Sequence, residues 1–343
     1  MNGGFWQYLL KRGLLGLLTL SVILFSSYAL MRLAPGDPTK SSMIGESDAS
    51  SQLSTEQNTL MRNESLYQKL HLDKPLHIGF LLWLKGVFHG DLGESAAVDK
   101  GRPVTELILE KLPVTLNLNL LAICITYILA IPLGIFSAVR PDTKTDHAIT
   151  FILFFLYSLP VLWTALMLQA LFCKGGWLPL FPLKGLVPDI QVGMTTWAIL
   201  GKTMLHYVLP VFCLSYAGFA GLSRFTRSGM LEVIHQDYIR TARAKGVPET
   251  GVIFHHALRN AMIIMITLFA GILPSLVSGS ILVEYVFNIP GMGSLSMLAL
   301  SSRDIPLLMA LFAFGGILTL LGILLSDILY VIADPRIDFN SRI

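Results

Sequence analysis

The chain has 343 residues, of which 53% are hydrophobic and only 14% are charged, and its mean hydropathy is +0.65. A soluble globular domain carries about 25% charged residues, so this composition excludes an ordinary soluble domain and indicates a membrane protein. The formal net charge of +3 comes from scattered basic residues, which excludes a nucleic-acid-binding surface.

The cysteines carry no signature of a disulfide framework or of a metal site. They are odd in number and widely spaced, and they lie in or at the ends of apolar runs, where they fit as small core residues: Cys124, Cys173 and Cys213. We therefore expect this chain to bind no metal.

An apolar run near the start of the chain, Leu14–Met31, follows the basic residues Lys11 and Arg12. A cleaved secretory signal peptide shows the same charge pattern, so two interpretations exist at this point. The run is long for the apolar part of a signal peptide, and no A-x-A-like cleavage site follows it. We favour an uncleaved first membrane span.

Apolar segments long enough to cross a bilayer, which needs about 20 such residues in helical form, recur along the chain. Six reach this length: Leu14–Ala34, Val114–Val139, Ile149–Phe172, Met204–Leu222, Ala261–Val286 and Ile305–Ala333. We predict an all-α polytopic membrane protein with six transmembrane helices. Prolines at positions 132, 160, 210 and 274 should kink these helices rather than break them, because neighbouring helices can satisfy the freed carbonyls.

Lysine and arginine are distributed unequally between the two sets of connections. With a cytoplasmic N-terminus, twelve lie on the inner face, and four lie in the short outer connections: Lys174, Lys184, Lys202 and Arg303. Basic residues favour the cytoplasmic side, so we expect both termini to be cytoplasmic. The predicted organisation is an N-terminal tail and first span (1–34), an extracytoplasmic segment (35–113) and a five-helix core (114–343).

The extracytoplasmic segment has two parts of different composition. Residues 40–59 are rich in Ser, Glu and Asn and lack the apolar content needed for packing, so we expect flexibility there. The apolar run His77–Val87 is too short to span a bilayer and predicts an interfacial or cap helix. A seventh span at this run would leave an odd number of crossings and would remove the charge asymmetry.

A charged segment lies between two strongly apolar runs. From Ser228 to Lys245, apolar side chains recur every three or four residues, which predicts an amphipathic helix: Leu231, Ile234, Tyr238 and Ala242. Gly246 can cap this helix, and Pro248 can start the next one. The pattern predicts a basic helix-turn-helix on the cytoplasmic face, but a basic helix lying on anionic lipid would show the same pattern.

Two motifs in this segment, "DYIRTARAKG" (237–246) and "HALRNA" (256–261), resemble the cytoplasmic EAA loop of binding-protein-dependent ABC importer permeases. The resemblance is to the peptide/nickel permease family and its first, B-type subunit. The chain departs from the general importer signature at the Glu, the first Ala and the Pro positions but fits the peptide-family variant. Further blocks resemble the family in the same order, among them "APGDP" (34–38), "VEYVFNIPGMG" (283–293) and "DPRI" (334–337).

The resemblance implies a type I importer permease fold and a coupling loop, residues 223–260, that docks on an ATPase. The implied partners are a second homologous permease, two ATP-binding subunits that hold ATP and Mg²⁺, and an extracytoplasmic solute-binding protein, in a bacterial inner membrane. The solute would be a dipeptide or oligopeptide, nickel, glutathione or an antimicrobial peptide. The implied ATPase-coupling residues are Asp237, Tyr238, Arg240, Thr241, Ala242, Arg243, Ala244, Lys245, Gly246, Arg259 and Asn260.

The sequence offers no nucleotide site of its own and no catalytic residues, so we expect a transport subunit rather than an enzyme. Its nearest approach to a phosphate-binding loop, Gly201-Lys202-Thr203, has Thr196 where such a loop needs a glycine. A secondary transporter should show inverted repeats and ionisable residues near midspan, and neither is evident. A channel or scaffold would leave the basic helix-turn-helix unexplained.

Polar residues within the spans have a structural and a functional interpretation. Glu284 could line the solute path, but we favour a pairing with Arg303. Asn117 and Asn119 are expected to form hydrogen bonds with neighbouring helices rather than with solute.

Overall fold

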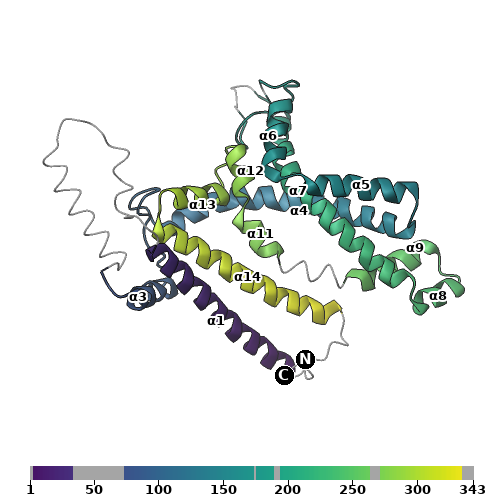
Figure 1. Cartoon of the computed structure of the whole chain (residues 1–343), viewed down its shortest axis with the longest axis horizontal. Helices are drawn as coiled ribbons and strands as arrows, with labels where there is room; N and C mark the ends of the chain where they lie inside the picture. Colours follow the sequence, from purple (N-terminus) through teal and green to yellow (C-terminus); the bar gives the residue numbers. More distant parts are fainter. Residues whose placement is uncertain (1–2, 34–72, 174, 189–193, 263–270, 334–343) are drawn as a thin grey trace. The chain divides into compact units, whose positions relative to one another are not determined.

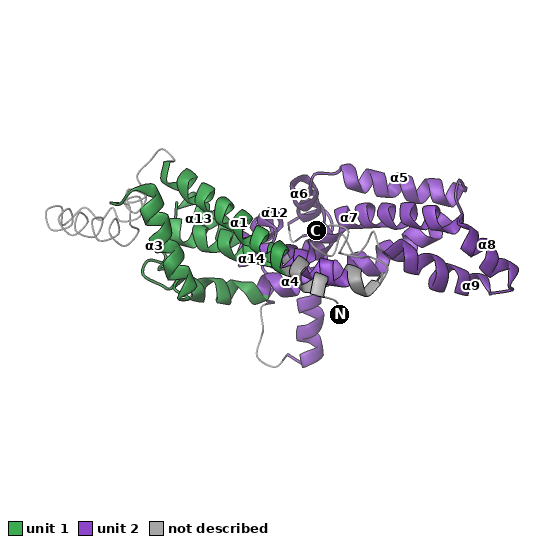
Figure 2. Cartoon of the chain, turned by 90° about the horizontal axis from the view of Figure 1, so that it is seen from below, with its two compact units in different colours: residues 1–113, 294–320 green, residues 114–293, 321–343 purple. Residues whose placement is uncertain are grey.

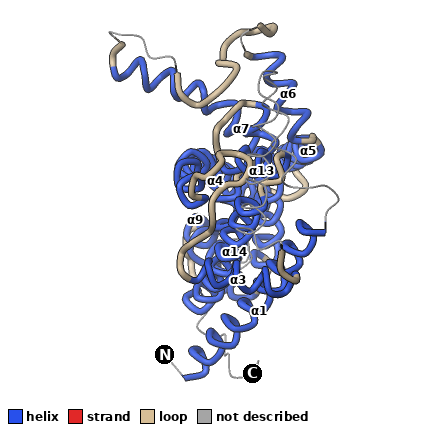
Figure 3. Tube along the Cα trace, turned by 90° about the vertical axis from the view of Figure 1, so that its left-hand side faces the viewer, coloured by secondary structure: helices blue, strands red, loops and turns tan. Residues whose placement is uncertain are grey.

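The computed structural model describes residues 3–33, 73–173, 175–188, 194–262 and 271–333. Throughout these ranges the regular secondary structure is helical (Figure 3), and two isolated bridges join Glu94 to Pro103 and Cys173 to Phe181. The predicted all-α class is confirmed for the described part of the chain. Residues 40–59, for which we predicted flexibility, lie outside it.

The helices are α1 to α14 in Figure 1, with gaps in the numbering. Their bounds are α1 Gly3–Leu33, α3 Leu76–Phe88, α4 Val104–Val139, α5 Lys144–Ser158, α6 Val161–Phe172, α7 Thr196–Ile234, α8 Asp237–Ala244, α9 Glu249–Gly251, the π-helix η2 Val252–Ala257, α11 Ile272–Ser278, α12 Ile281–Val286, α13 Met292–Ser301 and α14 Ile305–Ala333.

The chain divides into two compact units (Figure 2), and the boundaries fall inside α4, α13 and α14. The first unit contains residues 1–113 and 294–320, and the second contains residues 114–293 and 321–343. The predicted coupling loop lies entirely within the second unit.

Four described helices are long and apolar enough to cross a membrane: Leu10–Leu33, Val104–Val139, Thr196–Ile234 and Ile305–Leu329. They correspond to the first, second, fourth and sixth predicted spans. The fourth is much longer than predicted, because α7 runs for 39 residues and contains Pro210 without a break. At 1.5 Å per residue this helix is about 58 Å long, well beyond the roughly 30 Å of a hydrocarbon core.

The third predicted span is not one kinked helix. It consists of α5 and α6, which meet at an angle of 96° (Figure 1), so the prediction of a kink at Pro160 is wrong. Proline restricts the preceding residue to extended conformations, and Leu159 has a ψ of 124°. The Tyr216 hydroxyl donates a hydrogen bond of 2.6 Å to the Leu159 carbonyl, which satisfies a group that the break leaves open.

The fifth predicted span is also interrupted. Residues 263–270 lie outside the described part, and the remainder forms α11 and α12, with Gly279 between them at a φ of +67°. Such a φ is accessible to glycine at little cost, and the continuous helix predicted here is wrong. Pro274 lies in the first turn of α11, where the missing N–H costs no helical hydrogen bond.

The apolar run His77–Val87 forms the short helix α3, as predicted. Its Phe80 is buried in a cluster with Leu24 and Tyr28 of α1 and Met309 of α14. The Phe80 ring also meets the ring of Phe25 edge to face, with centroids 5.3 Å apart. Aromatic packing of this kind fixes α3 within the first unit.

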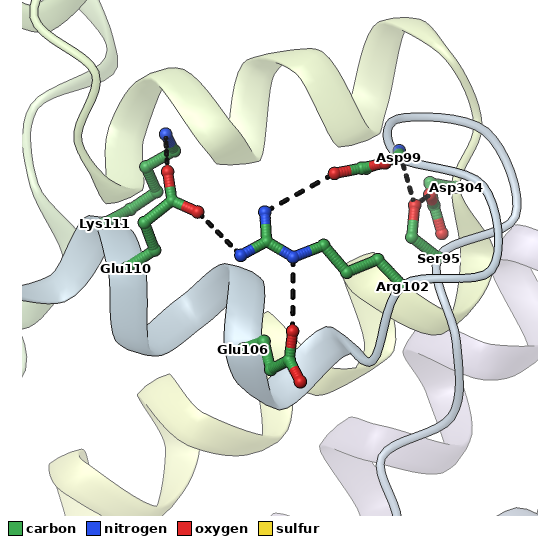
Figure 4. A network of polar contacts seen from close by, with 7 residues as sticks. All are labelled: Ser95, Asp99, Arg102, Glu106, Glu110, Lys111 and Asp304. Atoms are coloured by element: carbon green, nitrogen blue, oxygen red, sulfur yellow. Dashed lines mark hydrogen bonds and ion pairs between the residues drawn. The ribbon is translucent and has the colours of Figure 1, made fainter.

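A polar network in the first unit secures the loop before α4 (Figure 4). The buried carboxylate of Asp304 accepts hydrogen bonds from the Ser95 hydroxyl and from the backbone N–H groups of Ala97 and Val98, at 3.0 and 3.1 Å for the last two. It also accepts one from the N–H of Leu307 in the first turn of α14. One carboxylate therefore caps a helix and holds a loop that is distant in sequence.

Two polar residues of the predicted spans lie within the second unit. Asn119 donates hydrogen bonds to the carbonyls of Ser275 and Leu276, at 2.9 and 3.0 Å, which confirms its structural role. Glu284 is 1% exposed and accepts a hydrogen bond of 3.1 Å from Thr115. Its pairing with Arg303 stays a prediction.

Candidate functional site

The candidate site is the elbow, residues 237–260, which follows the end of α7. The structure does not continue α7 into it, so the single amphipathic helix predicted from Ser228 to Lys245 is wrong. His235 caps α7, Gln236 is extended with a ψ of 150°, and α8 begins at Asp237. Since α7 is longer than a bilayer core, it can carry the elbow out of the hydrocarbon region.

Gly246 ends α8 as the sequence predicts. Its φ is +77°, its N–H donates to the carbonyl of Arg243 at 3.0 Å, and the N–H of Val247 donates to the carbonyl of Ala242 at 3.2 Å. These two bonds form a Schellman motif, in which glycine takes the left-handed position that other residues occupy only with strain. The turn after α8 is therefore fixed by local sequence.

The second arm of the elbow starts after Pro248, also as predicted. A single helical turn, α9, leads directly into the π-helix η2, and residues 258–262 are helical again. The N–H of Val252 donates to the carbonyl of Pro248 at 3.1 Å, so the arm is hydrogen-bonded from its start.

An apolar cluster joins the elbow to the helices that carry it. Ile239 of α8 and Val252 of η2 are fully buried, and they pack with Met230 of α7 and with Ile135 and Ala138 of α4. The sequence analysis placed Tyr238 on the buried face and missed Ile239. The spacing of three between Ile239 and Ala242 was the available signal, since residues three apart share one face of a helix.

Ten of the eleven residues predicted to couple to an ATPase are exposed, and the exception is Ala242, which is buried within this chain. Ala242 therefore supports the elbow from inside. The exposed residues are Asp237, Tyr238, Arg240, Thr241, Arg243, Ala244, Lys245, Gly246, Arg259 and Asn260.

Charged groups of the elbow pair with one another. Arg243 donates two hydrogen bonds to Glu249, of 3.2 and 2.7 Å, across the turn at Gly246. The hydrogen bonds from Arg243 hold the pKa of the Glu249 carboxyl below its ordinary value. Arg240 and Asp237 make a weaker contact of 3.4 Å with side chains that are 72% and 96% exposed, and such pairs contribute little to stability.

A second polar contact connects the two arms. The side-chain amide of Asn260 donates a hydrogen bond of 2.6 Å to the Tyr238 hydroxyl, and it also donates to the carbonyl of His256 at 3.2 Å. Tyr238 is 42% exposed, so this contact lies at the edge of the elbow rather than in its core.

The C-terminal part of α7 carries an ion pair with a buried carboxylate, which the sequence analysis did not find. Arg227 donates to both carboxylate oxygens of Asp146 in the first turn of α5, at 3.1 and 2.8 Å. Asp146 also accepts hydrogen bonds from the Ser137 hydroxyl and from the N–H of Asp142. The Asp146 side chain is only 2% exposed, and the pair joins α7 to the start of α5.

Comparison with known protein families bears directly on this architecture. Residues 130–339, which include the elbow, match the family described as the inner membrane component of binding-protein-dependent transport systems. The chain belongs to this family. The long apolar helices agree with that description, and the protein is a multi-pass protein of the cytoplasmic membrane.

Members of the family with assigned roles resemble the chain over nearly its full length. It is 40% identical to the oligopeptide transport system permease protein AppB of Bacillus subtilis, over 97% of this chain and 99% of AppB. It is 35% identical to the di/tripeptide transport system permease protein DppB of Pseudomonas aeruginosa, over 91% of this chain and 92% of DppB. The predicted membership in the peptide permease group is thereby confirmed.

Among solved structures, this protein resembles a chain of the MetNI methionine ABC transporter, which was solved in inward-facing conformations. The match has a TM-score of 0.49 and 16% identity, over 67% of this chain and 97% of the other. The relatives in this family are described as permease or inner membrane components of transport systems, not as ATPases.

Proposed function

We propose that this protein is a transmembrane permease subunit of an ATP-driven importer for dipeptides or oligopeptides, and that the elbow couples it to ATPase subunits. The similarity to AppB and DppB over nearly the full chain carries the proposed solute class. In this assembly the chain has six spans and cytoplasmic termini, and it works with a second permease, two ATP-binding subunits that hold ATP and Mg²⁺, and an extracytoplasmic solute-binding protein.

The exposed face of α8 supports the coupling role. Its apolar side, Ile239 and Ala242, is anchored within this chain, while Arg240, Ala244 and Lys245 face outward. Cations on a helix that is held by its own core can fix the register of a partner surface by charge complementarity. ATP-driven movement of that partner would displace the elbow and, with it, the helices of the second unit.

The test is a charge reversal on the outward face, Arg240→Glu, in the complete transporter reconstituted in vesicles. Peptide uptake and ATP hydrolysis are measured together. We expect ATP hydrolysis to continue while peptide uptake per ATP falls by about tenfold, as loss of a close charge pair at an interface would produce.

The matched control is Lys144→Glu, which reverses an exposed charge at the start of α5, outside the elbow. It should leave uptake per ATP unchanged. Normal uptake by the Arg240→Glu transporter, or uptake by the wild type that persists without ATPase subunits, would contradict the proposed function.

A further inference from the structure

Arg243 and Tyr238 engage their polar groups in close hydrogen bonds inside the elbow itself, whereas the contact of Arg240 with Asp237 is longer, at 3.4 Å, and exposed to solvent. Arg243 is bound to Glu249 through two hydrogen bonds, and Tyr238 accepts a hydrogen bond from Asn260. We propose that Tyr238 and Arg243 are positioning residues that brace the elbow into one rigid arm, and that contact with the ATPase is left to Arg240 and Lys245. This inference rests on the proposed function of the elbow.

The Arg243 brace closes the flexible point of the elbow. Arg243 lies in the last turn of α8, Glu249 begins α9, and Gly246 lies between them in the left-handed conformation. The two backbone hydrogen bonds of the Schellman motif set the conformation of this turn, but glycine populates many backbone conformations, so a side-chain contact across the turn opposes its opening further. A guanidinium and a carboxylate joined by two parallel hydrogen bonds fix both distance and orientation, so the turn cannot open without breaking both bonds.

The Tyr238 brace acts at the other end of α8. Tyr238 lies in its first turn, and Asn260 lies in the helical residues 258–262 that continue toward the fifth predicted span. The Asn260 amide is itself held by the His256 carbonyl. The hydroxyl of Tyr238 therefore connects the start of α8 directly to the segment that follows η2.

The two braces lie at opposite ends of an eight-residue helix, which is about 12 Å long. Between them, Ile239 and Ala242 anchor α8 to its apolar cluster through one face only. A helix held on one face can rock about that face, and a polar contact at each end opposes such rocking. If a partner subunit displaced Arg240 or Lys245, the elbow would therefore move as one body and displace residues 258–262, and the turn at Gly246 would not bend.

The test exchanges the charges of the Arg243 brace. Arg243→Glu and Glu249→Arg are made singly and together in the complete transporter, and peptide uptake per ATP is measured with co-purification of the ATPase subunits. Each single variant should lower uptake per ATP about threefold with the ATPase still bound, and the double variant should restore most of the loss, because the pair is re-formed with opposite polarity.

Rescue by the double variant is the outcome that a docking role of Arg243 would not give. If Arg243→Glu releases the ATPase while Glu249→Arg does not, or if the double variant is no better than the singles, the brace is wrong. Unchanged uptake in both single variants would also overturn it. These outcomes are distinct from a failure of the proposed function, which the Arg240→Glu transporter reports separately.

The Tyr238 brace is tested by Tyr238→Phe, which removes only the hydroxyl that accepts from Asn260. Uptake per ATP should fall about threefold. Asn260→Ala removes the same contact together with the hydrogen bond to the His256 carbonyl, so adding Tyr238→Phe to Asn260→Ala should cause no further loss. Additive losses would show that the two residues act separately and would overturn this brace.

Discussion

Two arginine–carboxylate pairs in the second unit have similar geometry but different surroundings. Arg227 binds Asp146 with a shortest distance of 2.8 Å, and the carboxylate side chain is 2% exposed. Arg243 binds Glu249 at 2.7 Å, and the two side chains are 41% and 53% exposed. Similar distances therefore do not imply equal energies, because burial decides what happens when one partner is removed.

The difference in burial suits the two pairs to different roles, the first in holding helices together and the second in shaping the elbow. Removing one partner of a buried pair leaves an uncompensated charge, whereas an exposed partner is rehydrated by water at almost no cost. The buried pair joins α5 to α7, so its loss should be felt in the free energy of unfolding. The exposed pair lies in the elbow, where we expect it to affect the orientation of α8 and therefore transport, but to change the free energy of unfolding little.

The largest expected effect is on the buried pair. Arg227→Ala should lower the free energy of unfolding by about 3 kcal/mol, because Asp146 would lose its cation and remain buried. Thermal unfolding of the protein in detergent measures this loss. Arg227→Lys keeps the charge but not the two-pronged contact and should give an intermediate value. A loss below about 0.5 kcal/mol, the range of an exposed ion pair, would contradict the proposed difference between the two pairs.

A smaller effect is expected at the turn that the exposed pair spans. Gly246→Ala places a Cβ at a φ of +77° and should destabilise the folded protein by about 1 kcal/mol. Gly221→Ala is the matched control, since Gly221 lies inside α7 with no atom within 4 Å of the added Cβ. Alanine is the better helix former, so this control should stabilise by up to about 1 kcal/mol. Equal effects of the two changes would contradict the conformational explanation.

The smallest effect is expected for the exposed pair itself. Glu249→Gln should cost about 0.5 kcal/mol or less, after allowance for solvent screening, and the cost should shrink further in high salt. The pKa of Glu249 is lowered in the folded protein by Arg243, so its contribution is present above the ordinary glutamate pKa and is lost as pH falls through the folded value. Unfolding measured against pH and salt for the variant and the wild type checks both trends.

Sequence reasoning was most reliable where structure depends on neighbouring residues. The apolar runs that became α1, α4, α7 and α14 were recognised because length and hydropathy suffice to identify a membrane-spanning helix. Gly246 and Pro248 were assigned correctly because turn and cap geometry is a property of a few consecutive residues.

Tertiary structure decided what depends on residues far apart in the chain. Whether Pro160 kinks or breaks its span depends on a partner for the Leu159 carbonyl, and that partner is Tyr216. The assignment of Ile239 rather than Tyr238 to the core depends on where η2 and α4 lie. The Arg227–Asp146 pair likewise joins two helices across 81 positions of sequence. Local sequence thus determined the long apolar helices and the turn at Gly246, whereas breaks, burial and ion pairing were decided by packing, because only packing supplies the second partner.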